Sequence, residues 1–215
     1  MATVNRSPAD SLLSDDAWRV THHACVDLFA RPSHESVQLF DDAEGGARYW
    51  PSIVSPDVAH AWFETLMALE WQSMRRPMYD REVDVPRLLF HRRLDDPACP
   101  SLLGDILREV RARVDAPFSA AGLNLYRDGR DSVAMHGDKL HQIRGRQPIA
   151  IVSLGNVRRM NIRARGGARE RIAIDLAPGS LLVMSHASQS THEHGVPKTA
   201  RPVGPRMSVV YRVRP

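Results

Sequence analysis

The sequence predicts an α+β protein in which two helices brace the outer face of a barrel or a double-sheet jelly roll. Helical periodicity is confined to the first half of the chain, and about seven short strands follow it, separated by glycine and proline turns. These strands do not alternate with helices, which argues against a doubly wound parallel sheet. The 215 residues suit one domain of ordinary size.

The chain begins with a segment of little periodicity, residues 1–45, which we expect to be a loosely ordered arm with short strands near residues 24–29 and 37–40. A hydroxyl cap, a first-turn proline and an early acid then mark the start of a helix, at Ser55, Pro56 and Asp57. Apolar residues recur at helical spacing as far as about residue 71. The stripe that we expect to be buried consists of Val58, Trp62, Leu66 and Leu69.

Residues 74–93 follow this helix and carry several arginines and two prolines, so we expect a β-rich excursion there. A second helix is predicted over about residues 101–114, with Leu103, Ile106 and Val110 facing inward at three- and four-residue spacing. Both helices therefore precede the strand-rich half and are available to cover one face of it.

Short strands in the second half are predicted wherever apolar runs lie between turn residues such as Asp128-Gly129 and Pro178-Gly179. They fall at residues 122–127, 131–136, 148–154, 159–164, 171–176, 180–185 and 206–213. We therefore expect a single domain over residues 46–215, with its strand-rich core at about residues 120–214.

Composition excludes several classes of protein. Apolar residues make up 43% and charged residues 25% of the chain, so a packed core is expected. No run approaches the roughly 18 apolar residues that span a bilayer, and the N-terminus lacks the pattern of a signal peptide. Cys25 and Cys99 lie far apart and form no metal-binding pair, which is typical of reduced thiols in a cytoplasmic protein.

The basic residues favour an anionic partner without requiring one. Lysine and arginine number 29 against 25 acidic residues, which gives a formal net charge of +4. Most of these cations are arginines, whose planar group makes bidentate contacts with phosphate and carboxylate. Arginines in solvated surface loops would explain this excess of basic residues equally well. Nothing in the sequence indicates an obligate dimer, and we expect a monomer.

The tripeptide His136-Gly137-Asp138 is the first candidate for chemistry. Residues two apart on a strand point to the same face, so an imidazole and a carboxylate would converge there, although such tripeptides also occur in surface turns. His192 and His194 follow between two predicted strands. Two histidines and one carboxylate are typical of non-haem Fe(II) oxygenases, and hydrolytic zinc sites use the same ligands. The chain has no HExxH motif, so a zincin arrangement is absent.

Two arginines on the last predicted strand favour iron over zinc. Arg206, Ser208, Val210 and Arg212 would share one face, so that two guanidinium groups border one interior strip. A buried unpaired arginine is costly, whereas a dicarboxylate would neutralise the pair through bidentate hydrogen bonds. The alternative is that each arginine points to water or pairs with an acid. In combination with the metal candidates, the pair favours a dicarboxylate co-substrate.

Several ordered stretches contain these candidates. They are residues 124–138, with an N-x-Y…H-x-D pattern, residues 149–155 followed by Arg158, and residues 176–184, 194–198 and 205–212. In this order they resemble the AlkB family of Fe(II)- and 2-oxoglutarate-dependent dioxygenases, most clearly its nucleic-acid demethylases. The resemblance covers roughly residues 47–214.

The resemblance implies a double-stranded β-helix, or jelly-roll, core with an N-terminal nucleotide-recognition lid at about residues 74–93. It also implies Fe(II), 2-oxoglutarate and O2 as cofactor and co-substrates. Carried over by position, the iron ligands are His136, Asp138 and His194. No catalytic residue beyond these metal ligands is implied.

The same resemblance implies contacts with the co-substrate. Arg206 would anchor the distal carboxylate of 2-oxoglutarate, helped by the Tyr126 hydroxyl. Arg212 and Asn124 would contact the end that chelates iron, and Ser208 stands where asparagine is common in the family. A charged fork at one end and a metal at the other would leave a single orientation for 2-oxoglutarate.

Four residues are candidates for the substrate side. Tyr79 is expected to stack or wedge, and Arg87 to touch phosphate or base; a core tyrosine and a solvated arginine are the alternatives. His192 is expected to line the wall, because a fourth ligand would fill a metal position that O2 needs. Leu140 stands where relatives that act on methylated bases usually carry an acid.

The implied activity is oxidative removal of N-methyl groups from alkylated DNA or RNA, with release of formaldehyde, succinate and CO2. Leu140 and the modest net charge leave open an oxygenase of the same chemistry that acts on a protein side chain or a small molecule. A non-enzymatic jelly-roll binding module is the third hypothesis, and the ordered set of metal and arginine candidates argues against it.

Overall fold

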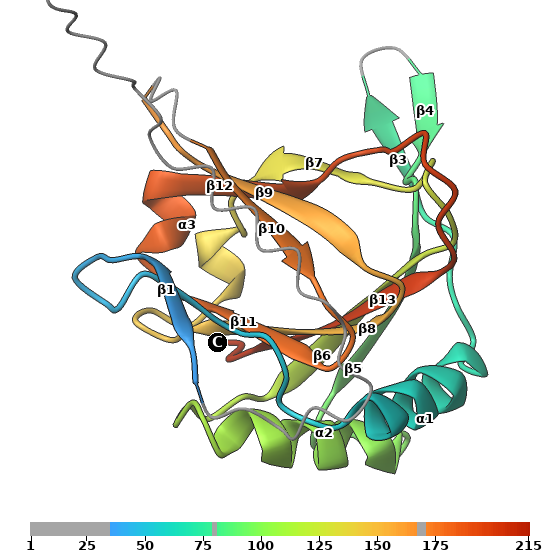
Figure 1. Ribbon diagram of the computed structural model, residues 1–215, viewed down its shortest axis with the longest axis horizontal. Coiled ribbons are helices and arrows are strands. Elements are labelled where there is room, and N and C mark those ends of the chain that lie inside the picture. Colours follow the sequence, from blue (N-terminus) through green and yellow to red (C-terminus); the bar gives the residue numbers. More distant parts are fainter. Residues whose placement is uncertain (1–34, 79–80, 167–170) are drawn as a thin grey trace, which may run out of the picture.

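The computed structural model describes residues 35–78, 81–166 and 171–215. Two β-sheets face each other, and helices α1 (Pro56–Met67) and α2 (Ser101–Arg111) lie against the outer face of the larger sheet (Figure 1). The strand pairs within these sheets are antiparallel. Mostly antiparallel strands in two facing layers, with few helices, are consistent with the jelly roll that the sequence predicts.

The larger sheet carries the residues that define the floor of the interior. Its strands, in spatial order, are β1 (Val37–Phe40), β2 (Ala47–Trp50), β11 (Ser180–Met184), β8 (Ile149–Gly155), β13 (Arg206–Arg212), β6 (Ala120–Tyr126) and β5 (Leu88–Arg93). Its central strands β8 and β13 are buried over almost their whole length, because helices cover one face and the second sheet covers the other. Strand β1 confirms the short strand expected at 37–40 within the N-terminal segment, and it pairs with β2 at the edge of the sheet. The strand expected at 24–29 lies outside the described residues.

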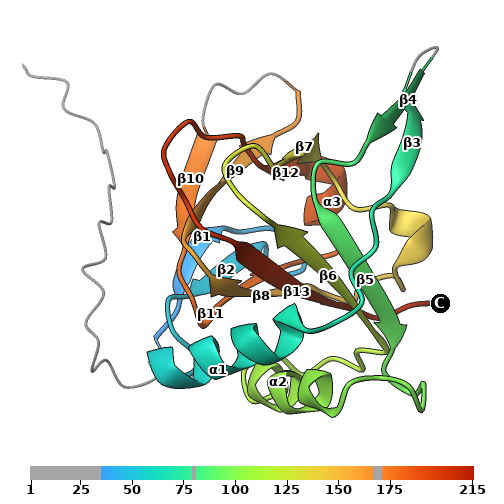
Figure 2. The same ribbon diagram turned by 90° about the vertical axis from the view of Figure 1, so that its right-hand side faces the viewer.

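The smaller sheet faces the larger one across the interior. Its order is β10 (Arg171–Leu176), β9 (Arg158–Ala164), β12 (His192–Val196) and β7 (Val133–His136). Strand β12 was missing from the prediction, which placed its two histidines in a connection. A separate hairpin, β3 (Arg75–Met78) and β4 (Arg81–Asp84), projects beyond both sheets (Figure 2). A 3-10 turn (Leu140–Gln142) and the short helix α3 (Ser188–Thr191) complete the described elements.

Helix α1 (Pro56–Met67) begins as predicted, because the Ser55 side chain accepts a hydrogen bond from the Val58 amide. The expected buried stripe is confirmed except at its first residue. Leu66 is buried and Trp62 and Leu69 pack against the core, whereas Val58 is 39% exposed and Ala59 and Phe63 are buried in addition. The helix rotates these residues toward the sheet, where they join the apolar cluster beneath β8 and β13. Periodicity alone does not decide between two adjacent stripes that are both apolar.

Helix α2 (Ser101–Arg111) buries Leu103, Ile106 and Val110 completely, as expected. The Tyr211 hydroxyl of β13 donates a hydrogen bond of 2.7 Å to the Leu103 carbonyl, which ties the helix to the centre of the sheet. The apolar core therefore has two parts. One fills the space between helices and sheet, and the other fills the space between the two sheets, where the candidate site lies. Within the described chain, no helix is long and apolar enough to cross a membrane.

Candidate active site

Three potential metal ligands converge between the facing sheets. His136 ends β7 and Asp138 follows two residues later, while His194 lies in β12, directly opposite His136 in the strand pairing. The ligand atoms of the three side chains all lie within 4.8 Å of one another. His136 Nε2 is 3.8 Å from Asp138 Oδ1. The strand pairing, together with the two-residue spacing in the tripeptide, therefore assembles the cluster.

The protonation states of the histidines leave lone pairs for a metal. His136 Nδ1 lies 2.8 Å from the Ala134 carbonyl oxygen, so we assign the proton to Nδ1 and the lone pair to Nε2. Burial, and after it the charge of His136, lowers the pKa of His194 to about 4, which keeps its ring neutral near pH 7. Among the described side chains, none gives His194 Nδ1 a hydrogen-bond partner, although this atom is buried. A buried ring nitrogen without a hydrogen-bond partner fits a metal site, which needs a free nitrogen lone pair.

Asp138 is held as a carboxylate with one oxygen free. Arg212 contacts Asp138 Oδ2 through Nε at 2.7 Å and Nη2 at 2.6 Å. Burial acts to raise the pKa of Asp138, but the charge of Arg212 and its hydrogen bond lower it below its ordinary value. Oδ1 is left facing the histidines. Two neutral imidazoles and one ionised carboxylate on one wall fit a divalent cation such as Fe(II).

A buried positive charge lies at the other end of β13. Arg206 is only 1% exposed, and its guanidinium donates one hydrogen bond of 2.8 Å, from Nη2 to Ser153 Oγ. Its Nε has no partner among the described side chains, and burial lowers its pKa. The Tyr126 ring lies 5.1 Å from the guanidinium carbon. A buried cation without a carboxylate partner in the described residues is a receptor for an anionic ligand.

Side chains between these two ends are already fixed by hydrogen bonds. Asn124 donates from Nδ2 to Ser208 Oγ at 3.2 Å and accepts from Arg87 Nε at 2.8 Å. The Arg87 side chain also donates to the Ser132 carbonyl at 3.3 Å. This chain of contacts connects β6, β13 and the segment that precedes β5.

A cavity of about 700 Å³ joins the metal candidates to the buried arginine. It brings together nine of the residues that the sequence singles out: His136, Asp138, His194, Asn124, Tyr126, Arg206, Ser208, Arg212 and Arg87. Arg206 and Arg212 lie on the same face of β13, as the alternation of side chains predicts. The face that they share forms the floor of this cavity.

Two predicted substrate residues are not part of the cavity lining. The His192 ring stacks on Phe40 at 3.9 Å and contacts Thr191 Oγ1 at 2.9 Å, because the start of β12 extends past the cavity toward β1. Leu140 lies in the 3-10 turn, which directs it toward solvent with 38% exposure. The predicted roles of these two residues therefore lack support from their positions. Tyr79 lies outside the described residues.

Sequence reasoning missed Ser153, Lys139 and Lys198. Ser153 is the only polar residue in the otherwise apolar run 149–154, and this exception was an available signal for a buried hydrogen-bonding role. Lys139 and Lys198 line the cavity from irregular segments, where no periodicity marks them. Together with Arg87, they add positive charge to its lining.

The class of protein follows from the site and from a family match. Residues 91–213, more than half of the chain, match the model of the 2OG-Fe(II) oxygenase superfamily. The chain belongs to this superfamily. Its fold is similar to a solved oxidoreductase of the 2OG-Fe(II) oxygenase family from Burkholderia pseudomallei, with a TM-score of 0.54 and 17% identity, over 78% of this chain and 84% of that one.

Two curated relatives are similar to about half of the chain. The DNA oxidative demethylase ALKBH2 of Bos taurus is 31% identical over 118 residues, which are 50% of this chain and 42% of the relative. The Alpha-ketoglutarate-dependent dioxygenase alkB homolog 3 of Homo sapiens is 32% identical over 120 residues, again 50% and 42%. The chain thus matches less than half the length of these relatives. Over the matched half it is similar to these AlkB-type dioxygenases, and membership of the 2OG-Fe(II) oxygenase superfamily implies Fe(II), 2-oxoglutarate and O2 as cofactor and co-substrates.

Proposed function

We propose that this protein oxidatively removes N-alkyl groups from nucleic-acid bases and releases formaldehyde, succinate and CO2. The observation that carries the proposal is the cavity with a cluster of potential metal ligands on one wall and, at its inner end, a fully buried arginine that has no carboxylate partner in the described part of the chain. The proposal also rests on similarity to a relative named as a DNA oxidative demethylase. We further propose that residues 46–215 form one domain in which residues 74–93 act as a lid.

His136, Asp138 and His194 would hold Fe(II), which supplies the activation of O2 that side chains alone lack. The Ala134 carbonyl orients the His136 ring, and Arg212 orients the Asp138 carboxylate. These contacts from the chain itself set the ligand atoms before any metal binds. Preorganisation of this kind is what the protein contributes to metal chemistry.

Arg206 would bind the distal carboxylate of 2-oxoglutarate, with Ser153 and Tyr126 beside it. Asn124 and Ser208 lie between Arg206 and the metal cluster, within reach of the rest of the co-substrate. Because Arg212 is engaged with Asp138, we assign it mainly to that carboxylate and secondarily to the co-substrate. A single anchoring charge at the closed end would fix one orientation of the dicarboxylate.

The substrate would enter at the opposite, more exposed side. The His136 side chain is 40% exposed and forms part of the cavity wall, where a flipped base could stack. Arg87, Lys139 and Lys198 also line the cavity and would meet phosphate groups. The projecting β3–β4 hairpin is the part of the proposed lid that Figures 1 and 2 place beyond the sheets.

One observation favours a second candidate function. The acids that line the cavity in the described chain are Asp84 and Asp138, and both are paired with arginines, Arg75 and Arg212. A free carboxylate to accept a hydrogen bond from the exocyclic amine of a base is therefore missing from this lining. The same iron chemistry on a protein side chain or a small molecule would not need one.

Mass spectrometry of methylated oligonucleotides distinguishes these candidates. The panel carries 1-methyladenine or 3-methylcytosine in single- and double-stranded DNA and RNA, incubated with the protein, Fe(II), 2-oxoglutarate and O2. We expect loss of the mass of one CH2 from at least one strand, with an equal amount of succinate. Succinate without loss of the methyl group would reject demethylation and favour the second candidate. The Asp138→Ala variant is the control for metal-independent signal.

A further inference from the structure

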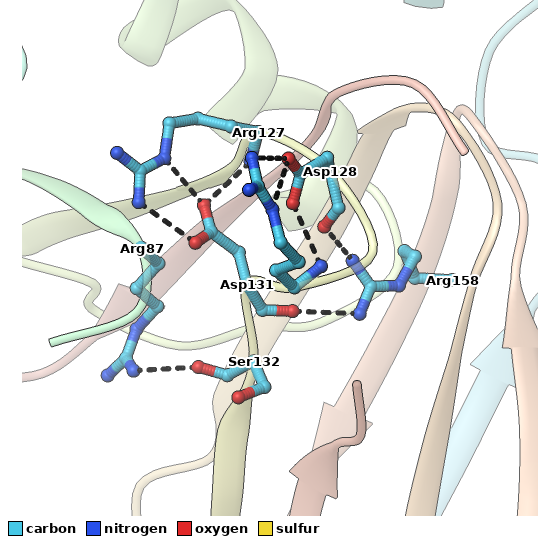
Figure 3. A network of polar contacts seen from close by, with 7 residues as sticks. Arg87, Arg127, Asp128, Asp131, Ser132 and Arg158 are labelled. Carbon is cyan, nitrogen blue, oxygen red and sulfur yellow. Dashed lines mark hydrogen bonds and ion pairs between the residues drawn. The ribbon is translucent and has the colours of Figure 1, made fainter. Parts of the chain in front are cut away.

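The side chain of Arg158 connects its own strand, β9, to the β6–β7 loop and to the segment that follows β12, near the closed end of the cavity. Arg158 is the first residue of β9 and is 3% exposed. Its Nη1 donates to the Asp128 carbonyl at 2.8 Å, and its Nη2 donates to the carbonyls of Asp131 at 2.9 Å and Pro197 at 2.7 Å. Figure 3 shows the guanidinium between the first two of these acceptors.

Each acceptor lies a few residues from a proposed functional side chain. Asp128 follows Tyr126 at the end of β6, and Asp131 precedes β7, which ends at His136. Pro197 follows β12, which carries His194. One guanidinium therefore ties the β6–β7 loop, which connects Tyr126 to the strand of His136, to the segment that follows the strand of His194. The planar, forked guanidinium of arginine suits these contacts with several carbonyls, whereas the ammonium group of lysine lacks this geometry.

The loop between β6 and β7 is braced a second time by its own ion pair. The Asp131 carboxylate accepts hydrogen bonds from the Arg127 amide at 2.9 Å and from its guanidinium at 2.8 and 2.9 Å (Figure 3). Because the side chain of Asp131 is fixed in this way, its carbonyl is presented to Arg158 in one direction. The acceptors of Arg158 are thus preorganised.

Arg158 also adds charge to the end where Arg206 lies. The guanidinium carbons of Arg158 and Arg206 are 5.8 and 5.1 Å from the centre of the Tyr126 ring. Among the described residues, neither arginine has a carboxylate within ion-pair distance. Burial lowers the pKa of Arg206, and the charge of Arg158 lowers it further, so an anion beside Arg206 would relieve both costs.

We propose that Arg158 is a positioning residue for 2-oxoglutarate, acting through the carbonyls that it fixes and through Tyr126. It does not line the cavity, so it acts without touching the co-substrate. The inference depends on the proposed place of the distal carboxylate beside Arg206. It does not depend on which substrate is oxidised.

The test compares two ligands that differ only at the distal end. 2-Oxoglutarate and 2-oxopentanoate share the 2-oxo acid, but the second has a methyl group in place of the distal carboxylate. Calorimetric titration of each into the anaerobic, Fe(II)-loaded full chain gives both affinities without turnover. We expect Arg158→Met to weaken 2-oxoglutarate about tenfold and to leave 2-oxopentanoate within about twofold of the wild type.

Two further variants separate positioning from general damage. Arg159→Met is the matched control, because Arg159 is the next residue, lies at the surface and pairs with Asp175; we expect no change in either affinity. Arg158→Lys keeps the charge but not the fork, and it should weaken 2-oxoglutarate less than Arg158→Met. It also serves as the second variant if Arg158→Met does not fold. Steady-state succinate formation should show a raised KM for 2-oxoglutarate with a similar kcat.

Equal loss of both ligands in Arg158→Met would assign Arg158 a purely structural role and overturn the proposal. Unchanged affinity for 2-oxoglutarate would overturn it as well. A wild-type protein that binds the two ligands equally would instead contradict the place of the distal carboxylate beside Arg206, which belongs to the proposed function. The two failures are therefore distinguishable.

Discussion

The two ends of strand β13 carry the same residue type in opposite electrostatic states. Arg212 pairs with Asp138 at 2.6 Å, so its charge is neutralised within the protein. Arg206 is fully buried, with Ser153 Oγ and the Tyr126 ring beside it and no carboxylate partner among the described residues. The first arginine orients a carboxylate that we propose as a metal ligand. The second costs stability until an anion binds, and this difference supports our proposal that the co-substrate binds at this end of the cavity.

A second contrast separates the closed and the open side of the cavity. The closed side is built from central strands whose register places Arg206 opposite Tyr126 and Ser208 opposite Ser153. The open side is built from irregular segments and partly exposed side chains such as Lys139. Recognition of a common co-substrate is therefore rigid, while recognition of the substrate is left to adaptable parts of the chain.

The largest effect is expected from Asp138→Ala. Loss of this carboxylate removes a proposed metal ligand, so Fe(II)-dependent succinate formation should fall to background. It also leaves Arg212 without its partner, and the metal-free variant should be less stable by about 3 kcal/mol in urea unfolding. Asp175→Ala, at a surface ion pair with Arg159, is the control and should retain turnover. Substantial turnover in Asp138→Ala would remove it from the metal site.

Arg206→Met should raise the free energy of unfolding in the absence of co-substrate, whereas Asp138→Ala should lower it. The variant loses the proposed anchor, so the KM for 2-oxoglutarate should rise about a hundredfold or more. Without co-substrate, however, removal of a buried uncompensated charge should raise the free energy of unfolding by about 1–2 kcal/mol. Urea unfolding of both proteins with and without 2-oxoglutarate measures this. A loss of stability in both conditions would mean that Arg206 is already satisfied within the fold.

A smaller effect is expected from Tyr126→Phe, which keeps the ring between the arginines and removes only the hydroxyl. The KM for 2-oxoglutarate should rise about three- to tenfold, which corresponds to about 1 kcal/mol, the net value of a typical hydrogen bond. Tyr211→Phe is a matched control on the opposite face of β13, where the hydroxyl bonds the Leu103 carbonyl. It should lower stability without changing KM. The reverse pattern would place the co-substrate elsewhere.

The smallest effect is expected from substitution of a lysine on the open side of the cavity. If Lys139 contacts a phosphate, Lys139→Gln should reduce the log–log salt dependence of binding to a single-stranded oligonucleotide by roughly 0.7. Arg108→Gln removes a charge of similar exposure from α2, on the helix-covered side, and should leave the slope unchanged. A salt-independent wild type would count against nucleic acid as the substrate.

The central strands and the cluster of site residues were predictable because a strand has a simple periodicity. A two-residue spacing placed His136 with Asp138 and aligned Arg206 with Arg212, and the structure brings all four to one cavity. What the sequence did not reveal was pairing between distant segments. The engagement of Arg212 by Asp138 depends on how the two sheets face each other, which no local pattern encodes.

Two positions that differ from expectation have the same cause. His192 shares a strand with His194, yet its position at the start of β12 lets it stack on Phe40 from a strand more than 150 residues away in sequence. Val58 belongs to the expected apolar stripe of α1, yet the sheet buries Ala59 and Phe63 in its place. Tertiary packing decided between alternatives that were locally equivalent.

The most direct test of the co-substrate site is a paired titration of wild type and Arg206→Met with 2-oxoglutarate and 2-oxopentanoate, under anaerobic conditions with Fe(II) bound. We expect the wild type to prefer 2-oxoglutarate by about a hundredfold or more and the variant to lose nearly all of that preference. A variant that still discriminates between the two ligands as the wild type does would show that the distal carboxylate is read by some other group.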